Sequence, residues 1–155
     1  MTCIATLEQG AFEMESTPSS IAAKIRPVLS GCEEIVAAYL FGSAVSDRWR
    51  PDSDMDIAVL LNEEGGPIDR KALRERLLPP LSRALRDDVH LLVLNNASYL
   101  ARSQVFNKGD PLYIRDYKQL ALFRMKNYAL YAEFAPYLQR TREGLRRRTR
   151  RGHGG

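Results

Sequence analysis

Two short segments dominated by apolar side chains constrain the fold of this chain more than any other feature. They span residues 35–41 (IVAAYLF) and 55–61 (MDIAVLL), and polar residues or glycine bound both of them. A third segment of the same kind spans residues 89–94 (VHLLVL). Runs of this length are typical of β-strands buried on both faces of a sheet. Because such strands need cover on both faces, we expect a mixed α/β or α+β sandwich with helices packed on the sheet.

The segments between these strands carry capping residues, turn signals and apolar residues at helical spacing. They predict, in chain order, a helix from Ser19 or Ser20 to residue 29, a loop or short helix at 43–53, a helix from Pro67 to residue 78 with a short piece to residue 86, a helix at 97–106, a strand at 112–115 and a long helix at 117–148. Pro79 and Pro80 should break or kink the helix that begins at Pro67, because proline lacks the backbone N–H that a helix interior needs. Pro136 should likewise kink the long helix.

The length of 155 residues and the hydrophobic content of 45% suit one globular domain with a real core. No run approaches the roughly 18 uncharged apolar residues of a membrane span. The first twenty residues lack the basic start and apolar stretch of a secretory signal, so we expect a cytoplasmic protein with no membrane partner. Cys3 and Cys32 are too few for a disulfide framework and are expected to be reduced thiols.

Positive charge is concentrated at the end of the chain. Residues 140–155 hold seven arginines and one acid, whereas the rest holds 16 basic and 18 acidic residues. The body is therefore close to neutral, and nucleic-acid binding is expected only through the basic tail. This pattern predicts an N-terminal extension at 1–18, a catalytic domain at 19–139 and an arginine-rich tail at 140–155.

Four residues near the first two strands suggest a site for a phosphorylated ligand. Gly42 follows the first strand and allows close approach of a ligand to the backbone, and Ser43 adds a hydroxyl donor. A helix beginning there would offer free N–H groups to phosphate. Asp54 and Asp56 are two residues apart on a strand, so their carboxylates share a face and repel each other unless a cation binds. Hard oxygen ligands select Mg²⁺ or Mn²⁺.

A turn that can bind phosphate, followed by a pair of carboxylates, is typical of enzymes that carry out metal-dependent phosphoryl or nucleotidyl transfer. Arg48 and Arg50 lie between the two motifs. Either they clamp phosphate oxygens, with Arg48 the stronger candidate for nucleotide binding, or they belong to a solvated loop.

The pattern Gly42-Ser43-x10-Asp54-x-Asp56 resembles the signature of the polymerase-β-type nucleotidyltransferases. It is most similar to the minimal nucleotidyltransferases (MNT), which include antitoxins paired with HEPN ribonuclease toxins. The resemblance covers roughly residues 33–140. It implies an α+β fold with a small mixed sheet, helices packed on it and a long C-terminal helix. It also implies that Gly42 and Ser43 hold the triphosphate of ATP, and that Asp54 and Asp56 bind one or two Mg²⁺ ions.

The same resemblance implies an adenylyltransferase that acts as an antitoxin. Such a protein transfers AMP from ATP to a hydroxyl, here a tyrosine of a cognate HEPN toxin, and so silences the ribonuclease. Two alternatives remain open. A weakened site would leave an antitoxin that neutralises its toxin by contact alone, and a small-molecule nucleotidyltransferase of the aminoglycoside-modifying kind would use a different acceptor.

The third strand departs from the family pattern. The family has a third carboxylate there, which binds one metal ion and helps to deprotonate the attacking hydroxyl. Aligned on Leu94-Asn95, this position is His90. His90 is predicted to join Asp54 and Asp56 as a catalytic residue, because an imidazole is a good general base near neutral pH. Alternatively, Asp88 reaches the site from the same strand face, the site holds fewer metal ions, or His90 is an ordinary strand residue.

Overall fold

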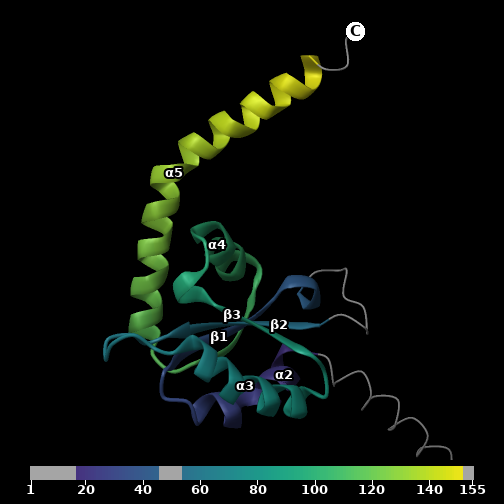
Figure 1. The fold of residues 1–155 in the computed structure, drawn as a ribbon, viewed down its shortest axis with the longest axis vertical. Helices are drawn as coiled ribbons and strands as arrows, with labels where there is room; N and C mark the ends of the chain where they lie inside the picture. Colours follow the sequence, from purple (N-terminus) through teal and green to yellow (C-terminus); the bar gives the residue numbers. More distant parts are fainter. Residues whose placement is uncertain (1–16, 46–53, 152–155) are drawn as a thin grey trace, which may run out of the picture.

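The computed structural model describes residues 17–45 and 54–151. It contains a four-stranded mixed sheet with helices on both faces, which confirms the predicted α+β fold (Figure 1). The elements in chain order are α2 (Pro18–Ser30), β1 (Ile35–Phe41), the 3-10 helix η2 (Gly42–Ala44), β2 (Met55–Leu61), α3 (Arg70–Leu85), β3 (Val89–Val93), the 3-10 helix η3 (Leu94–Asn96), α4 (Tyr99–Lys108), β4 (Asp110–Ile114) and α5 (Tyr117–Arg151).

The strand order in the sheet is β3-β2-β1-β4. β1 is antiparallel to both β2 and β4, whereas β3 is parallel to β2. β1 and β2 are central and almost wholly buried, as their continuous apolar runs predict. β3 is an edge strand and keeps buried residues only at alternate positions, Leu91 and Val93. Val89 packs against the core from its edge, whereas His90 is exposed and not part of the core.

Each face of the sheet has its own core (Figure 1). On one face, α2 and α3 pack through buried residues such as Ile25, Leu29 and Leu81. On the other face, α4 and the first turns of α5 pack through a second cluster that includes Val105 and Phe106. Asp56 and His90 alternate with Ala58 and Leu92 of this second cluster, so they lie on the face that α4 and α5 partly cover.

The expected break at Pro79 and Pro80 is wrong, because α3 is one helix from Arg70 to Leu85. An interior proline costs about 3 kcal/mol or more. Against that cost, one stripe of α3 is fully buried against the sheet on both sides of the prolines, and burial of each leucine contributes roughly 1.5–3 kcal/mol. That stripe consists of Leu73, Leu77 and Leu81. Packing therefore outweighs local propensity.

Helix starts also differ from the predictions. α3 begins after Asp69, whose carboxylate accepts the backbone N–H groups of Lys71 and Ala72, and not at Pro67. α2 is capped by Thr17, two or three residues earlier than expected, with Pro18 in its first turn. Both caps satisfy backbone donors that a helix start leaves unpaired.

α5 runs from Tyr117 to Arg151, extends beyond the sheet and bends partway along (Figure 1). Pro136 lies inside this helix, and an interior proline is the usual cause of such a bend. The predicted boundary at residue 139 falls within α5. No helix in the described part of the chain is long and apolar enough to cross a membrane.

The thiol of Cys32 is buried and forms no disulfide, as predicted, whereas Cys3 lies outside the described residues. Burial raises the pKa of Cys32, and a contact of 3.0 Å from Sγ to Glu34 Oε2 adds to the effect. Because the thiolate is the reactive form, a raised pKa makes Cys32 an inert structural residue.

Asn127 interrupts the apolar stripe of α5 and is nevertheless buried, with 1% of its surface exposed. Its Nδ2 donates to Ser103 Oγ at 3.0 Å and to the Tyr99 carbonyl at 3.5 Å. Within the described residues, its Oδ1 has no hydrogen-bond partner. A buried, unpaired carbonyl oxygen is costly, so this polar contact between α4 and α5 is only half satisfied.

We therefore expect the Asn127→Leu protein to be as stable as the wild type or up to about 1 kcal/mol more stable. The Ser103 hydroxyl keeps its donation to the Tyr99 carbonyl at 2.8 Å in that variant. Asn127→Asp should instead lower the free energy of unfolding by about 3 kcal/mol, because it buries an unpaired charge. Urea unfolding of the three proteins measures both effects, and equal losses for leucine and aspartate would contradict this explanation.

Candidate active site

Three strands bring the predicted site residues together at one end of the sheet. Asp56 is the second residue of β2, and it pairs with Phe41 at the end of β1 and with His90 on β3. Gly42 follows Phe41 directly as the first residue of η2. Because residues opposite each other on paired strands share a face, this register brings Asp56 and His90 side by side.

The carboxylate of Asp56 lies between the Gly42 backbone and the His90 ring. Its Oδ1 is 3.2 Å from His90 Nδ1. Its Oδ2 lies so close to Gly42 that a Cβ atom at position 42 would collide with it. Gly42 also has a φ of +75°, in the left-handed region that favours glycine. Position 42 therefore needs glycine for two independent reasons.

Asp54 directly precedes β2 and is exposed, two residues before Asp56 and on the same face by strand alternation. Ser43 lies in η2, beside Gly42. This helix has only three residues, so it supplies backbone N–H groups but lacks the macrodipole of an α-helix that the sequence suggested. Arg48 and Arg50 lie outside the described residues.

A divalent cation fits this donor set only with help from a ligand. Within the described residues, no group of three or more His, Cys, Asp or Glu side chains is placed to hold a metal ion. Mg²⁺ is usually bound by one or two carboxylates, with substrate phosphates and water completing its octahedron. Asp54 and Asp56 match that arrangement, because both carboxylates are at least partly accessible to solvent.

His90 is 66% exposed, so it is a surface residue of an edge strand. Asp88, the alternative third acid, is also exposed. The backbone carbonyl of Asp88 accepts the N–H of Met55 at 2.8 Å, which ties the start of β3 to β2. Of these two residues, His90 is the one whose side chain contacts Asp56.

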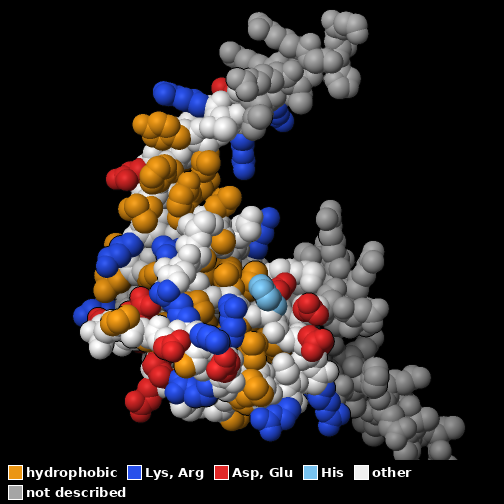
Figure 2. Space-filling model, in the orientation of Figure 1, with side chains coloured by type: hydrophobic (Ala, Val, Ile, Leu, Met, Phe, Trp, Pro, Cys, Tyr) orange, Lys and Arg blue, Asp and Glu red, His pale blue; other side chains and the backbone are white. Residues whose placement is uncertain are grey.

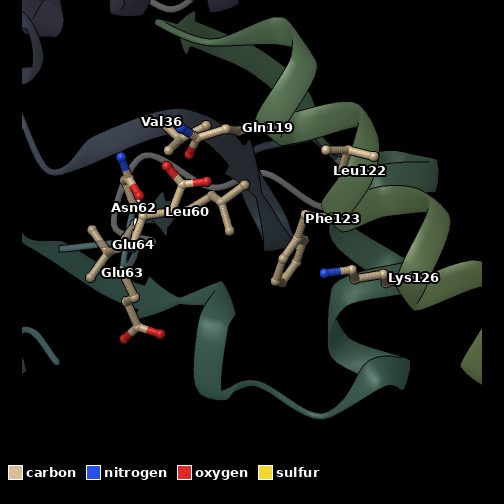
Figure 3. Close-up of a pocket in the computed structure, with 10 residues that line it drawn as sticks. Val36, Leu60, Asn62, Glu63, Glu64, Gln119, Leu122, Phe123 and Lys126 are labelled. Carbon is tan, nitrogen blue, oxygen red and sulfur yellow. Dashed lines mark hydrogen bonds between the residues drawn. The ribbon is translucent and has the colours of Figure 1, made fainter. Parts of the chain in front are cut away.

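A cavity of about 350 Å³ lies at the opposite end of β1 and β2, and no sequence signal indicated it (Figure 3). Phe123 and Lys126 point into it from α5, toward Leu60 of the sheet (Figure 3). Glu63 and Glu64 also line it, and their carboxylates would repel a triphosphate. The cavity therefore does not suit a nucleotide, and the strand ends around Asp56 remain the candidate active site.

Residues 23–118 match the family described as polymerase beta nucleotidyltransferase. The chain is 33% identical over 107 residues to the protein adenylyltransferase MntA of Shewanella oneidensis, which covers 69% of this chain and 70% of MntA. A shorter match, 48% identical over 44 residues, is to spectinomycin 9-adenylyltransferase of Staphylococcus aureus. It covers 28% of this chain but only 17% of that enzyme.

Solved structures show the same relationship. One is a toxin–antitoxin crystal structure with AMP-PNP, at 30% identity and a TM-score of 0.65 over 80% of this chain and 97% of that chain. Another is the tri-AMPylated Shewanella oneidensis HEPN toxin in complex with MNT antitoxin, at 28% identity and a TM-score of 0.62 over 83% of this chain and 98% of that chain. The match over residues 23–118, together with these relatives, shows that this chain belongs to the polymerase-β nucleotidyltransferase family, within the MNT-type group that includes the MntA antitoxins.

Proposed function

We propose that this protein is an Mg²⁺-dependent adenylyltransferase and an antitoxin, which transfers AMP from ATP to a tyrosine hydroxyl of a cognate HEPN ribonuclease toxin. The observation that carries the proposal is the position of the Asp56 carboxylate, between the backbone of Gly42 and the ring of His90. A carboxylate beside an open backbone turn suits a metal-bound triphosphate. The kinship with MntA supports the choice of AMP and of a protein acceptor.

In the proposed step, the acceptor oxygen forms a bond to the α-phosphorus of ATP. The bond from that phosphorus to the oxygen bridging to the β-phosphorus breaks, and pyrophosphate leaves. The backbone N–H groups of Gly42 and Ser43 would hold phosphate oxygens, and Arg48 is proposed to add a cation to them. Mg²⁺ held by Asp54 and Asp56 would neutralise charge on the phosphates. Most of the rate then comes from positioning and charge neutralisation.

The hydroxyl proton of the acceptor needs a base, and we propose His90 for that role. Its Nδ1 lies 3.2 Å from Asp56 Oδ1. In the neutral imidazole one ring nitrogen donates and the other accepts, so a tautomer that donates Nδ1–H to the carboxylate has Nε2 as its acceptor. Asp56 would therefore orient His90 as well as bind the metal ion, which is how this site would work without the family's third carboxylate.

The experiment that tests this proposal measures incorporation of label from α-³²P-ATP, with Mg²⁺, into a candidate HEPN-type partner protein. Labelled toxin and loss of its ribonuclease activity are expected. Inhibition of the ribonuclease without label would instead establish a contact-only antitoxin. Spectinomycin serves as the second acceptor, because the short match to spectinomycin 9-adenylyltransferase favours that alternative. Label on spectinomycin alone would overturn the protein acceptor.

His90→Ala is expected to lower the rate of AMP transfer at least about 10-fold, since a positioned base contributes 10²–10⁴-fold. His90→Asp should restore much of the loss, because it supplies the carboxylate of the family pattern. Its charge would not be buried, since position 90 is largely exposed. Single-turnover transfer rates, with folding checked by circular dichroism, measure both effects.

Asp88→Asn is the matched control for His90, because it changes an exposed side chain two residues away and leaves the backbone bond to Met55 in place. It should transfer AMP at the wild-type rate. Loss of transfer in Asp88→Asn together with full activity of His90→Ala would assign the base to Asp88 instead.

A further inference from the structure

The middle of α5 is rich in apolar side chains and extends past the elements of this chain that could cover them. Residues 127–138 (NYALYAEFAPYL) contain one charged side chain, Glu133. In Figure 2, hydrophobic side chains gather along this part of α5, where the helix extends beyond the sheet and α4. An apolar stripe on a helix is normally buried against another element. Its exposure in the isolated chain therefore indicates a surface that a partner covers.

One face of this segment is a continuation of the core stripe. Leu120, Phe123 and Asn127 of α5 face the domain, and the same helical spacing leads on past the end of α4. The residues beyond it form what we call the α5 apolar surface, consisting of Leu130, Tyr131, Phe134 and Tyr137. Phe134 is 44% exposed and Tyr137 is 65% exposed. Aromatic side chains of this kind are the usual anchors of protein interfaces.

The α5 apolar surface is anchored to the domain by ring contacts. The Phe134 ring stacks on the Tyr99 ring of α4 with a centroid distance of 5.4 Å. The Tyr131 ring contacts the Tyr99 ring edge-on, with a centroid distance of 6.4 Å. Phe134 in turn contacts Tyr137 at 6.5 Å. The surface is therefore held in place before binding, which reduces the entropy lost when a partner docks.

Charges on both sides of this surface disfavour a second copy of the chain as the occupant. Residues 117–126 carry three basic side chains and no acid, and residues 140–151 carry seven arginines and one acid. An antiparallel pair of α5 helices would place these two basic segments against each other, and a parallel pair would place the arginines side by side. In either arrangement the positively charged side chains of the two copies would repel each other. A partner with acidic side chains has no such penalty.

We propose that the cognate toxin docks on the α5 apolar surface through an apolar patch bordered by acidic side chains, which Arg140 and Arg142 contact. This inference rests on the proposed function for the identity of the partner. In this proposal α5 provides the affinity for the toxin, and the residues at the ends of the strands carry out AMP transfer. The two features are on different elements, so binding and transfer can be tested separately.

The test measures, by calorimetry, the affinity of the full chain for the candidate HEPN-type partner protein. All proteins carry Asp54→Asn, so that transfer does not alter the toxin during the measurement. Phe134→Asp should weaken binding at least about 30-fold, as loss of a central aromatic anchor does. Met125→Asp is the matched control, because Met125 is 67% exposed and lies nine residues away, on the opposite face of the same helix. It should bind within about twofold of the unchanged chain.

Tyr137→Asp provides a second variant in case loss of the Phe134 ring disturbs α4, since Tyr137 does not stack on Tyr99 in the described contacts. It too should weaken binding at least about 30-fold. Arg140→Glu with Arg142→Glu should lower the affinity and flatten its dependence on salt, because exposed charge pairs are screened. Affinity and salt dependence unchanged in this double variant would overturn the acidic border.

Two outcomes would overturn the docking site itself. One is equal toxin affinity for the Phe134→Asp, Tyr137→Asp and Met125→Asp proteins. The other is a dimer of the free chain in sedimentation that Phe134→Asp dissociates, because a second copy would then occupy the surface. Tight binding that depends on Phe134, together with no AMP incorporation by the chain that retains Asp54, would instead contradict only the proposed transfer activity.

Discussion

Replacing Asp56 by asparagine should reduce AMP transfer by more than about 10³-fold. Loss of residues that merely support a metal ligand costs roughly 10–100-fold, so loss of a ligand itself should cost more. The amide would also present N–H groups toward His90 or the Gly42 backbone, where the carboxylate now lies. Asp54→Asn should give a similar loss through the same cation. Transfer of α-³²P label to the toxin measures both.

The fold should survive these changes. Asp56 is partly exposed at the end of the sheet, and removing one of two neighbouring negative charges relieves repulsion. Glu64→Gln is the control, because it makes the same change of charge at the cavity near the other end of β2. It should leave transfer unchanged. Wild-type transfer in both the Asp54→Asn and Asp56→Asn proteins would place the metal site elsewhere.

Gly42→Ala should abolish transfer and also destabilise the protein by about 1–3 kcal/mol. A left-handed backbone at a non-glycine residue alone costs roughly 1–2 kcal/mol. In addition, the new Cβ would collide with the Asp56 carboxylate, which must then move away from His90 or displace the turn. Urea unfolding measures the stability, and label transfer measures the activity.

Gly65→Ala is the matched control for Gly42→Ala, because a Cβ at position 65 has no neighbour within 4 Å. It should behave as the wild type. The double variant Gly42→Ala with Asp56→Ala should recover part of the lost stability but no activity, since the collision with the carboxylate is removed. If the stability loss of the double variant equals the sum of the losses of the Gly42→Ala and Asp56→Ala single variants, Gly42 and Asp56 do not interact.

Several features of the site follow from local sequence patterns. The apolar runs predicted β1 and β2 to the residue, and strand alternation predicted that Asp54 and Asp56 share a face. The alignment on Leu94-Asn95 placed position 90 at the site, and the structure brings His90 to within 3.2 Å of Asp56. The bounds of β1 and β2 and the place of position 90 could be predicted because burial on both faces and the two-residue period of a strand are local properties. That Asp54 and Asp56 share a face stays a prediction.

Other features depended on packing that no local pattern encodes. α3 passes through two prolines because a stripe of buried leucines holds both of its halves against the sheet. The two prolines favour a break in the helix. The packing energy that outweighs this tendency comes from contacts with residues distant in sequence. The same holds for Asn127, which is polar and yet buried between α4 and α5.

By itself, the sequence determined the two central strands and their alternation with helices, and it supplied the candidate site residues. Only the tertiary structure decided that Asp56 lies between Gly42 and His90, because that contact depends on the register of β2 with both β1 and β3. It also decided that the apolar stripe of α5 extends past α4 and stays exposed. Periodicity shows which side chains share a face, whereas the cover of that face depends on where other elements end.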